Sequence, residues 1–303
     1  MKKILVPTDF SQTAEKAFRF AVNLALKVDG AIVLYHVYTP VNSTFIGVEQ
    51  DRRIYNAQMK DKALKRLQRL KKKVAGEPCS IAIETIVARS PLTGSILSFA
   101  RQNEIDLITM GTQGASGLKK VLVGSEASRI AGESPVPVLL IPEKFEWKDP
   151  RDIVFATNYD FSELHALQLA IEFAKIYEAG ITVVHFFELT ATRDSLKIEM
   201  GFFQRFADHI KKLFSSCQIA FKPILTDSVE ETIENLSREV PYDTMVMVRR
   251  NKTYLQKLFS KSFTRAMSYV TTIPLLIVPA AYKPNQNHAD GLTIMDNHRQ
   301  VSN

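Results

Sequence analysis

The sequence predicts an α/β fold built as two tandem, doubly wound domains, each with a five-stranded parallel sheet. Three observations predict it. Short β-rich apolar runs alternate with longer amphipathic stretches along the chain. The same succession of runs occurs twice, in units of roughly 140 residues. The length of 303 residues suits two domains of ordinary size.

The elements of the first half can be placed in order from these patterns. Strands are expected where branched or aromatic apolar residues cluster, and helices where apolar residues recur along one face. Ser11 and Ser125 can cap helix N-termini, and Pro91 suits an opening turn. Strict alternation of strand and helix predicts a parallel sheet with helices on both faces. Expected strands lie at 4–6, 31–37, 81–87, 107–110 and 136–141, and expected helices at 12–28, 60–74, 92–101 and from about 125.

The second half repeats the first at two different offsets. Near its start, Ile4, Thr8, Ala17 and His36 recur 149 positions later as Ile153, Thr157, Ala166 and His185. Near its end, Asp106, Met110, Leu139 and Pro142 recur 137 positions later as Asp243, Met247, Leu276 and Pro279. The second unit therefore has a shorter middle. We expect one domain at 1–146, a second at 150–281, and a flexible polar tail at 282–303.

Composition restricts the classes of partner and compartment. The 39 basic and 32 acidic side chains give a net charge of +7, which suits an anionic ligand. The basic run at 65–73 has the spacing of a solvated helix face, and no nucleic-acid signature occurs, so no nucleic acid partner is expected. No apolar run approaches the roughly 20 residues of a membrane helix, so no membrane association is expected. Only two cysteines, Cys79 and Cys217, fit a reducing, cytoplasmic location.

The most informative stretch lies at 110–128, between an expected strand and an expected helix. It contains four of the twelve glycines, Gly111, Gly114, Gly117 and Gly124. Glycines let the backbone approach a ligand closely, and a helix N-terminus offers unpaired N–H groups, so the stretch favours an anion such as phosphate. It is not a P-loop, because Gly124 is followed by Ser125-Glu126, and it is not a GxGxxG fingerprint.

The spacing Gly111-x2-Gly114-x9-Gly124-Ser125 resembles the nucleotide-binding motif of the universal stress protein family. The resemblance extends over nearly all of residues 2–142, including VPTDFS at 6–11, the pair His36-Val37, and PVPVLLIP at 135–142. It implies the Rossmann-like universal stress protein fold, and ATP as the ligand, with or without Mg²⁺.

The resemblance also implies a role for each matching position. Pro7, Thr8, Asp9 and Val37 would border the adenosine, with Asp9 bonded to a polar edge of the nucleoside. Met110 and Gly111 would flank the ribose and α-phosphate, and Gly114, Gly124 and Ser125 would surround the phosphates with the backbone N–H groups of Glu126 and Ala127. The Glu126 carboxylate would repel a triphosphate unless it points outward or meets Mg²⁺, so its side chain is left out of the site.

Several of these residues have a second interpretation. Asp9 and Ser11 can act as caps of the first helix, and Met110 can be a core residue. Arg89 is either a surface charge or a side chain that reaches toward the phosphates. No metal site and no catalytic residue is expected, because neither ligand spacing nor a nucleophile with its base is apparent.

The second half has lost the glycine loop. Gly111, Gly114, Gly117 and Gly124 correspond to Val248, Asn251, Tyr254 and Lys261, and Asp9 corresponds to Asn158. Valine and tyrosine lack the backbone freedom of glycine, so this half is not expected to bind ATP. The loop is basic instead, with Arg249, Arg250, Lys252, Lys257, Lys261 and Arg265. These residues form either a solvated face or a docking surface for an acidic partner or for the neighbouring unit.

The resemblance implies an ATP-binding stress-response or regulatory protein with adenine nucleotide as its partner, and the glycine-rich stretch agrees with a phosphate ligand. It is not expected to be an enzyme; a slow ATPase or phosphotransferase, and a nucleotide-independent adaptor, are the alternatives. The last strands, 136–141 and 273–278, are apolar edges that need a cover. In the family such strands commonly pair, which implies an internal pseudo-dimer of the two halves and allows a homodimer.

Overall fold

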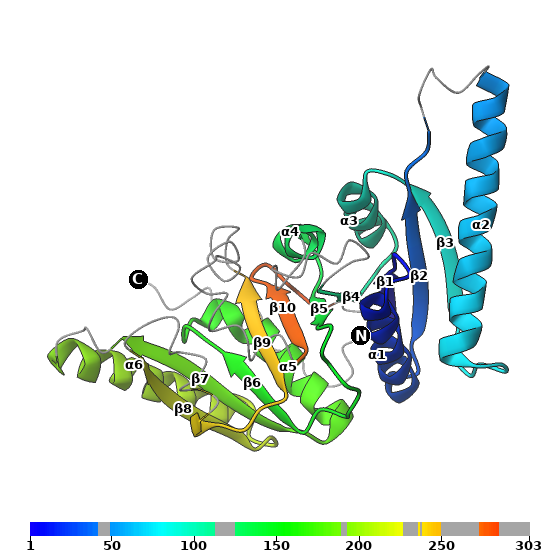
Figure 1. Ribbon diagram of the computed structural model, residues 1–303. Helices are drawn as coiled ribbons and strands as arrows, with labels where there is room; N and C mark the ends of the chain where they lie inside the picture. The colour runs from blue at the N-terminus through cyan, green and yellow to red at the C-terminus, as the bar shows by residue number, and fades with distance from the viewer. Residues whose placement is uncertain are drawn as a thin grey trace.

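The computed structural model describes residues 1–41, 49–112, 125–188, 193–226, 236, 238–249 and 273–284. Within these residues the strands form one ten-stranded sheet, in the order β3-β2-β1-β4-β5-β10-β9-β6-β7-β8 (Figure 1). Every described pairing in it is parallel except that of β5 with β10. The α/β fold class predicted from the alternating pattern is confirmed.

The first half contains the expected elements, and all but one lie within about two residues of their predicted bounds. The exception is α2, which begins eleven residues before the predicted position 60. Its only buried residues are Ala63, Leu67 and Leu70, so the part before residue 60 has no apolar period to reveal it. The elements are β1 Lys3–Pro7, α1 Gln12–Val28, β2 Ala31–Tyr38, α2 Glu49–Ala75, β3 Ile83–Arg89, α3 Leu92–Gln102, β4 Leu107–Gly111, α4 Ser125–Glu133 and β5 Val138–Ile141.

The second half has the same strand order, with β8-β7-β6-β9-β10 matching β3-β2-β1-β4-β5. A short 3-10 turn, η1, precedes its first α-helix, whereas α1 has no such turn before it. The elements are β6 Asp152–Ala156, η1 Phe161–Glu163, α5 Leu164–Tyr177, β7 Gly180–Glu188, α6 Arg193–Leu213, β8 Ile219–Thr226, β9 Thr244–Arg249 and β10 Leu275–Pro279. Of the basic loop residues, all except Arg249 lie outside the described residues.

Equivalent hydrogen bonds show that the repeat extends to structural detail. The Asp106 carboxylate accepts from the backbone N–H groups of Lys2 and Lys3, at 2.8 and 2.9 Å. The Asp243 carboxylate accepts from the N–H of Arg151 at 3.0 Å. In each half, therefore, an aspartate before the fourth strand holds the start of the first strand. The recurrence of this residue in the sequence has a structural reason.

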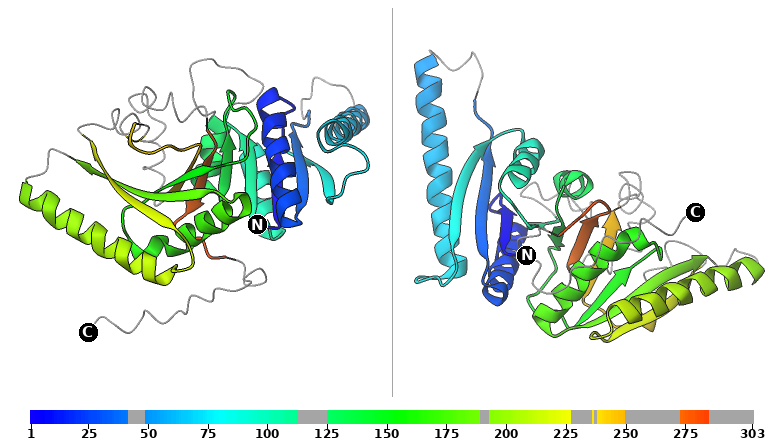
Figure 2. Two further views of the ribbon diagram at one scale, coloured as in Figure 1. Left: turned by 90° about the horizontal axis from the view of Figure 1, so that it is seen from below. Right: turned by 180° about the vertical axis from the view of Figure 1, so that it is seen from behind.

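The halves meet along β5 and β10, which pair antiparallel, with Leu139 opposite Leu276. This is the pairing of last strands that the sequence led us to expect, and it satisfies both edges by backbone hydrogen bonds. One face of the sheet is covered by α1, α2, α5 and α6, whose core residues form a single continuous cluster (Figure 2). The helices α3 and α4 pack on the opposite face.

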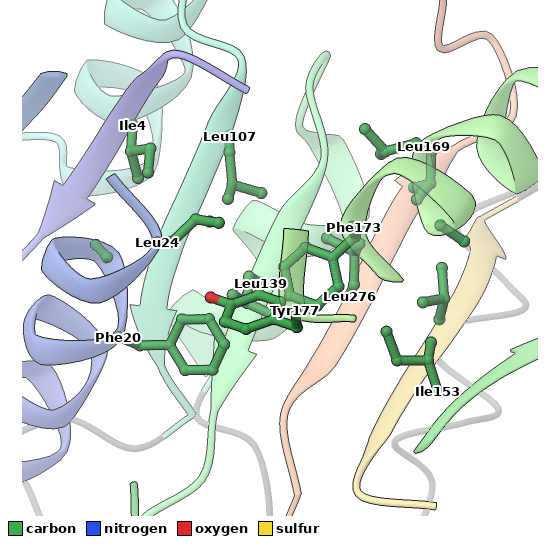
Figure 3. Close-up of a cluster of buried hydrophobic side chains, with 14 of the residues drawn as sticks. Ile4, Phe20, Leu24, Leu107, Leu139, Ile153, Leu169, Phe173, Tyr177 and Leu276 are labelled. Atoms are coloured by element: carbon green, nitrogen blue, oxygen red, sulfur yellow. The ribbon is translucent and has the colours of Figure 1, made fainter. Parts of the chain in front are cut away.

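Aromatic side chains fill the continuous core at this junction. Phe20 of α1 is fully buried and lies 6.4 Å, centroid to centroid, from Tyr177 of α5. Figure 3 shows both rings beside Leu139. Phe145 and Trp147, from the segment that joins the halves, also pack against Phe20, with ring centroids 6.0 and 4.9 Å away. The first and second halves therefore share one core on this face.

Three remaining predictions concern membrane helices, the C-terminal tail and the domain boundaries. In the described residues, no helix combines the length and apolarity needed to cross a membrane. Tyr282, at the start of the predicted tail, packs against the core, and residues 285–303 of that tail lie outside the described residues. The predicted domain boundaries stay predictions.

Candidate functional site

A pocket of about 340 Å³ opens at the carboxyl ends of β1, β2 and β4, beside the N-terminus of α4. Because β1 and β4 are neighbours whose connections run in opposite directions, this is the position where doubly wound sheets bind ligands. The predicted site residues in the described part of the chain all line it: Pro7, Thr8, Asp9, Val37, Met110, Gly111, Ser125, Glu126 and Ala127. Gly114 and Gly124 lie outside the described residues.

The turn from β1 into α1 presents Thr8 and Asp9 to this pocket. The Thr8 hydroxyl accepts from the N–H of Phe10, which has a positive φ of 66°. An Asp9 carboxylate oxygen accepts from the N–H of Ser11 at 3.0 Å, and the Ser11 hydroxyl accepts from the N–H of Ala14. The helix cap expected at Ser11 is thus confirmed. Asp9 is exposed, stabilises the turn, and borders the pocket.

His36 at the end of β2 fixes the same turn from the other side. Its Nδ1 lies 2.7 Å from the Thr8 carbonyl oxygen, an acceptor, so Nδ1 carries the proton. Its ring lies 4.5 Å from that of Phe10, over which the Arg66 guanidinium stacks at 3.9 Å. Burial lowers the pKa of His36, against the raising effect of the Thr8 carbonyl. We therefore expect His36 to be neutral at neutral pH.

Gly111 is required by close packing rather than by a left-handed conformation. A Cβ at this position would lie 2.7 Å from the Thr13 Cγ2 and 3.0 Å from the Thr13 carbonyl carbon. The end of β4 therefore approaches the first turn of α1 as only glycine allows. The second half has Val248 at the position equivalent to Gly111, and the residue equivalent to Thr13 is Ser162, which lies in η1 rather than in an α-helix.

Glu126 has partners within the protein. Its carboxylate accepts from the Thr93 hydroxyl of α3 at 2.5 Å and lies 3.5 Å from the Arg129 guanidinium. Within the described residues no lysine or arginine lines the pocket, so an anion there would meet chiefly the N–H groups of α4. Arg89 donates to the Tyr38 hydroxyl at 3.3 Å and does not line the pocket. The interpretation of Arg89 as a phosphate ligand is not supported.

Sequence reasoning missed the pocket residues that come from the packed faces of helices and strands. His36 was noted for its recurrence as His185 and within the pair His36-Val37, but it was not assigned to the site. Thr93, whose hydroxyl donates to the Glu126 carboxylate, gave no signal in the sequence. Which helix faces meet over a sheet depends on tertiary packing, which a single sequence does not encode locally. The lining residues that were missed are Ala14, Tyr35, His36, Leu92, Ile96, Thr112 and Ile130.

Comparison with known proteins identifies the first half. The model of the universal stress protein family matches residues 1–142. A universal stress protein of Methanocaldococcus jannaschii is 32% identical over 142 residues, covering 46% of this chain and 81% of the relative. The chain belongs to the universal stress protein family. A universal stress protein of Bacillus subtilis is 30% identical over 146 residues, covering 46% of this chain and 97% of the relative.

The fold of both halves also resembles a universal stress protein structure. The crystal structure of a universal stress protein from Archaeoglobus fulgidus matches with a TM-score of 0.64 at 17% identity, covering 91% of this chain and 96% of that one. At this identity the likeness concerns the fold alone. It extends across the second half, which the family model does not match.

In this universal stress protein, Arg249 joins the second half to the helix beside the pocket. Its guanidinium donates to the carbonyl oxygens of Gly132 and Ser134, at the C-terminal end of α4, the second at 2.8 Å. Burial lowers the pKa of Arg249, against the raising effect of the nearby Glu133 carboxylate. Arg249 therefore does not belong to a solvated face. It contacts the neighbouring unit, as the second interpretation of the basic residues expected. In the described residues no cluster suitable for a metal ion occurs.

Proposed function

We propose that this universal stress protein binds ATP, alone or with Mg²⁺, in the first-half pocket, as a regulatory or stress-response protein rather than an enzyme. One observation carries the proposal. Residues chosen from a sequence motif, and separated by up to 120 positions, line a single pocket at the switch point of the sheet. Pockets of roughly 300–1,000 Å³ with apolar walls and few polar groups are typical ligand sites.

The chemistry of the lining suits a nucleotide. Val37, Met110 and Ile130 supply apolar surface for a base, and Thr8 and Asp9 supply polar groups at one side of it. The N-terminus of α4 offers backbone N–H groups and the positive end of a helix dipole to phosphate oxygens. The shielding of the Glu126 carboxylate by Thr93 and Arg129 reduces its repulsion of that phosphate.

We propose further that the domains at 1–146 and 150–281 form an internal pseudo-dimer through β5 and β10. Because these strands already cover each other, a homodimer of the whole chain would need a different surface. Cys79 and Cys217 are unpaired, which fits a reducing, cytoplasmic compartment.

The test is ATP binding by the purified full chain, measured by calorimetry and compared with the double variant Gly114→Val/Gly124→Val. We expect saturable binding by the wild type and its loss in the variant, because valine restricts the backbone of a loop that needs glycine. Gly201→Val is the matched control, since a Cβ there has no neighbour within 4 Å. A folded wild type that binds no nucleotide, or equal binding by the double variant, would refute the proposal.

A further inference from the structure

The turn after the first strand is built in the same way in both halves. In the second half the Thr157 hydroxyl accepts from the N–H of Tyr159 at 2.9 Å, as Thr8 does from Phe10. His185 Nδ1 lies 2.7 Å from the Thr157 carbonyl oxygen, the same distance as between His36 and Thr8. Tyr159 has a positive φ of 47°. The two turns can therefore be compared atom by atom.

One residue in this framework differs in kind. Position 14 holds alanine, which is buried and lines the first-half pocket. The equivalent position, 149 residues later, holds Glu163, whose side chain is 2% exposed. Its carboxylate accepts from the Thr157 hydroxyl at 2.6 Å and from the N–H of Asn158 at 3.2 Å. In the second half, a carboxylate therefore lies against the groups that correspond to the Thr8 hydroxyl and the Asp9 N–H.

We propose that Glu163 is a built-in ligand that closes the second half to nucleotide. Its carboxylate fills a position that Ala14 leaves open in the first half, where an acceptor atom of a bound nucleotide would meet the Thr8 hydroxyl and the Asp9 N–H. A buried carboxylate excludes such a ligand by occupying the acceptor position, and its negative charge disfavours an anionic ligand in the same pocket. Nucleotide is thus excluded from the second half by the Glu163 side chain as well as by the loss of the loop glycines. The part of this inference that concerns the first half rests on the proposed function.

A glutamate equivalent to Glu163 can be introduced at position 14 of the first half without destabilising α1. Ala14 is the third residue of α1 after the Ser11 cap. Glutamate is favoured at this position by the helix dipole, and the Ser11 N–H that a capping glutamate would otherwise contact already donates to Asp9. Ala14→Glu is therefore expected to fold, with its carboxylate beside Thr8 as Glu163 lies beside Thr157.

The first experiment measures ATP binding by wild type, Ala14→Glu and Gln12→Glu in the full chain. We expect Ala14→Glu to weaken binding by about 100-fold or more, a loss expected from a buried charge facing an anion. Gln12→Glu adds the same charge in the same turn, but Gln12 is exposed and lies outside this pocket, so binding should change by less than about threefold. If Ala14→Glu binds ATP with the affinity of the wild type, the inference about Glu163 is overturned. If the wild type itself binds no ATP, the proposed function is refuted instead.

The second experiment does not depend on nucleotide. Hydrogen exchange of the Asn158 amide is measured by NMR in wild type, Glu163→Ala and Glu163→Gln. Removal of the acceptor should accelerate exchange by about tenfold or more in the alanine variant, and glutamine, which keeps an acceptor oxygen, should accelerate it less. The Thr157 amide, which donates to the Val184 carbonyl, is the internal control for global opening. If the exchange rate of the Asn158 amide, relative to that of the Thr157 amide, is unchanged in both variants, the role of Glu163 as the acceptor for the Asn158 N–H is overturned.

Discussion

Gly111→Val is expected to lower the free energy of unfolding by about 3 kcal/mol and to abolish nucleotide binding. A Cβ at this position would lie 2.7 Å from a Thr13 methyl group and 3.0 Å from the Thr13 backbone. The second contact is with backbone, so the first turn of α1 has to move, and forced overpacking of this kind typically costs about 1–3 kcal/mol. The same turn carries Ala14, and the turn before it carries Thr8 and Asp9, so the pocket changes with it.

Denaturant unfolding and ATP titration of the same samples test this expectation. Gly201→Val is the control, because a Cβ within α6 meets no atom within 4 Å and glycine is a poor helix former. It should leave stability unchanged or raise it slightly, and should not affect binding. A Gly111→Val protein as stable as the control would show that the approach of β4 to α1 does not require glycine.

Phe20→Ala should destabilise the protein by about 3–5 kcal/mol, the usual cost of removing a buried aromatic side chain. Phe20 is fully buried, with 0% of its surface exposed, and its ring packs against those of Phe145, Trp147 and Tyr177. Since Tyr177 belongs to α5 of the second half, the cavity forms in the core that the halves share. Both halves should therefore lose stability, although the substitution lies in the first.

The single tryptophan makes this measurable. Trp147 packs edge-on against Phe20, so its fluorescence reports on the junction during urea unfolding, while far-UV circular dichroism reports on both halves. Phe202→Ala is the control, because Phe202 is 49% exposed on α6 and should cost under about 1 kcal/mol. If Phe20→Ala is no more destabilising than this control, the two halves do not depend on a common core.

Much of the fold could be predicted because its signals are local. Ser11 marked the start of α1, the run of apolar residues at 31–37 gave β2, and the repeated positions gave the order of elements in the second half. The start of α2 was predicted too late, because a solvated helix has no apolar face there. The pairing of β5 with β10 was implied by the family resemblance and by the need to cover two apolar edges, but the register that places Leu139 opposite Leu276 was not predicted.

The site could be predicted in part for a related reason. The turn residues Thr8 and Asp9 and the end of β4 belong to short contiguous motifs. Ile96 and Ile130 enter the pocket only because α3 and α4 pack on one face of the sheet, which no local pattern encodes. Arg249 was predicted with its neighbours as a basic loop, but its partners are carbonyl oxygens 115 and 117 positions away. Comparison of Ala14 with Glu163 required the turn geometry of both halves.

Under the proposed function, the fold occurs twice in this chain and binds nucleotide in the first half alone. Native mass spectrometry of the full chain, equilibrated with ATP and Mg²⁺, tests this by counting bound nucleotides per folded chain. We predict a single adduct at saturation in the wild type and none in Ala14→Glu. A second specific adduct at saturation, or one adduct that persists in Ala14→Glu, would contradict the account.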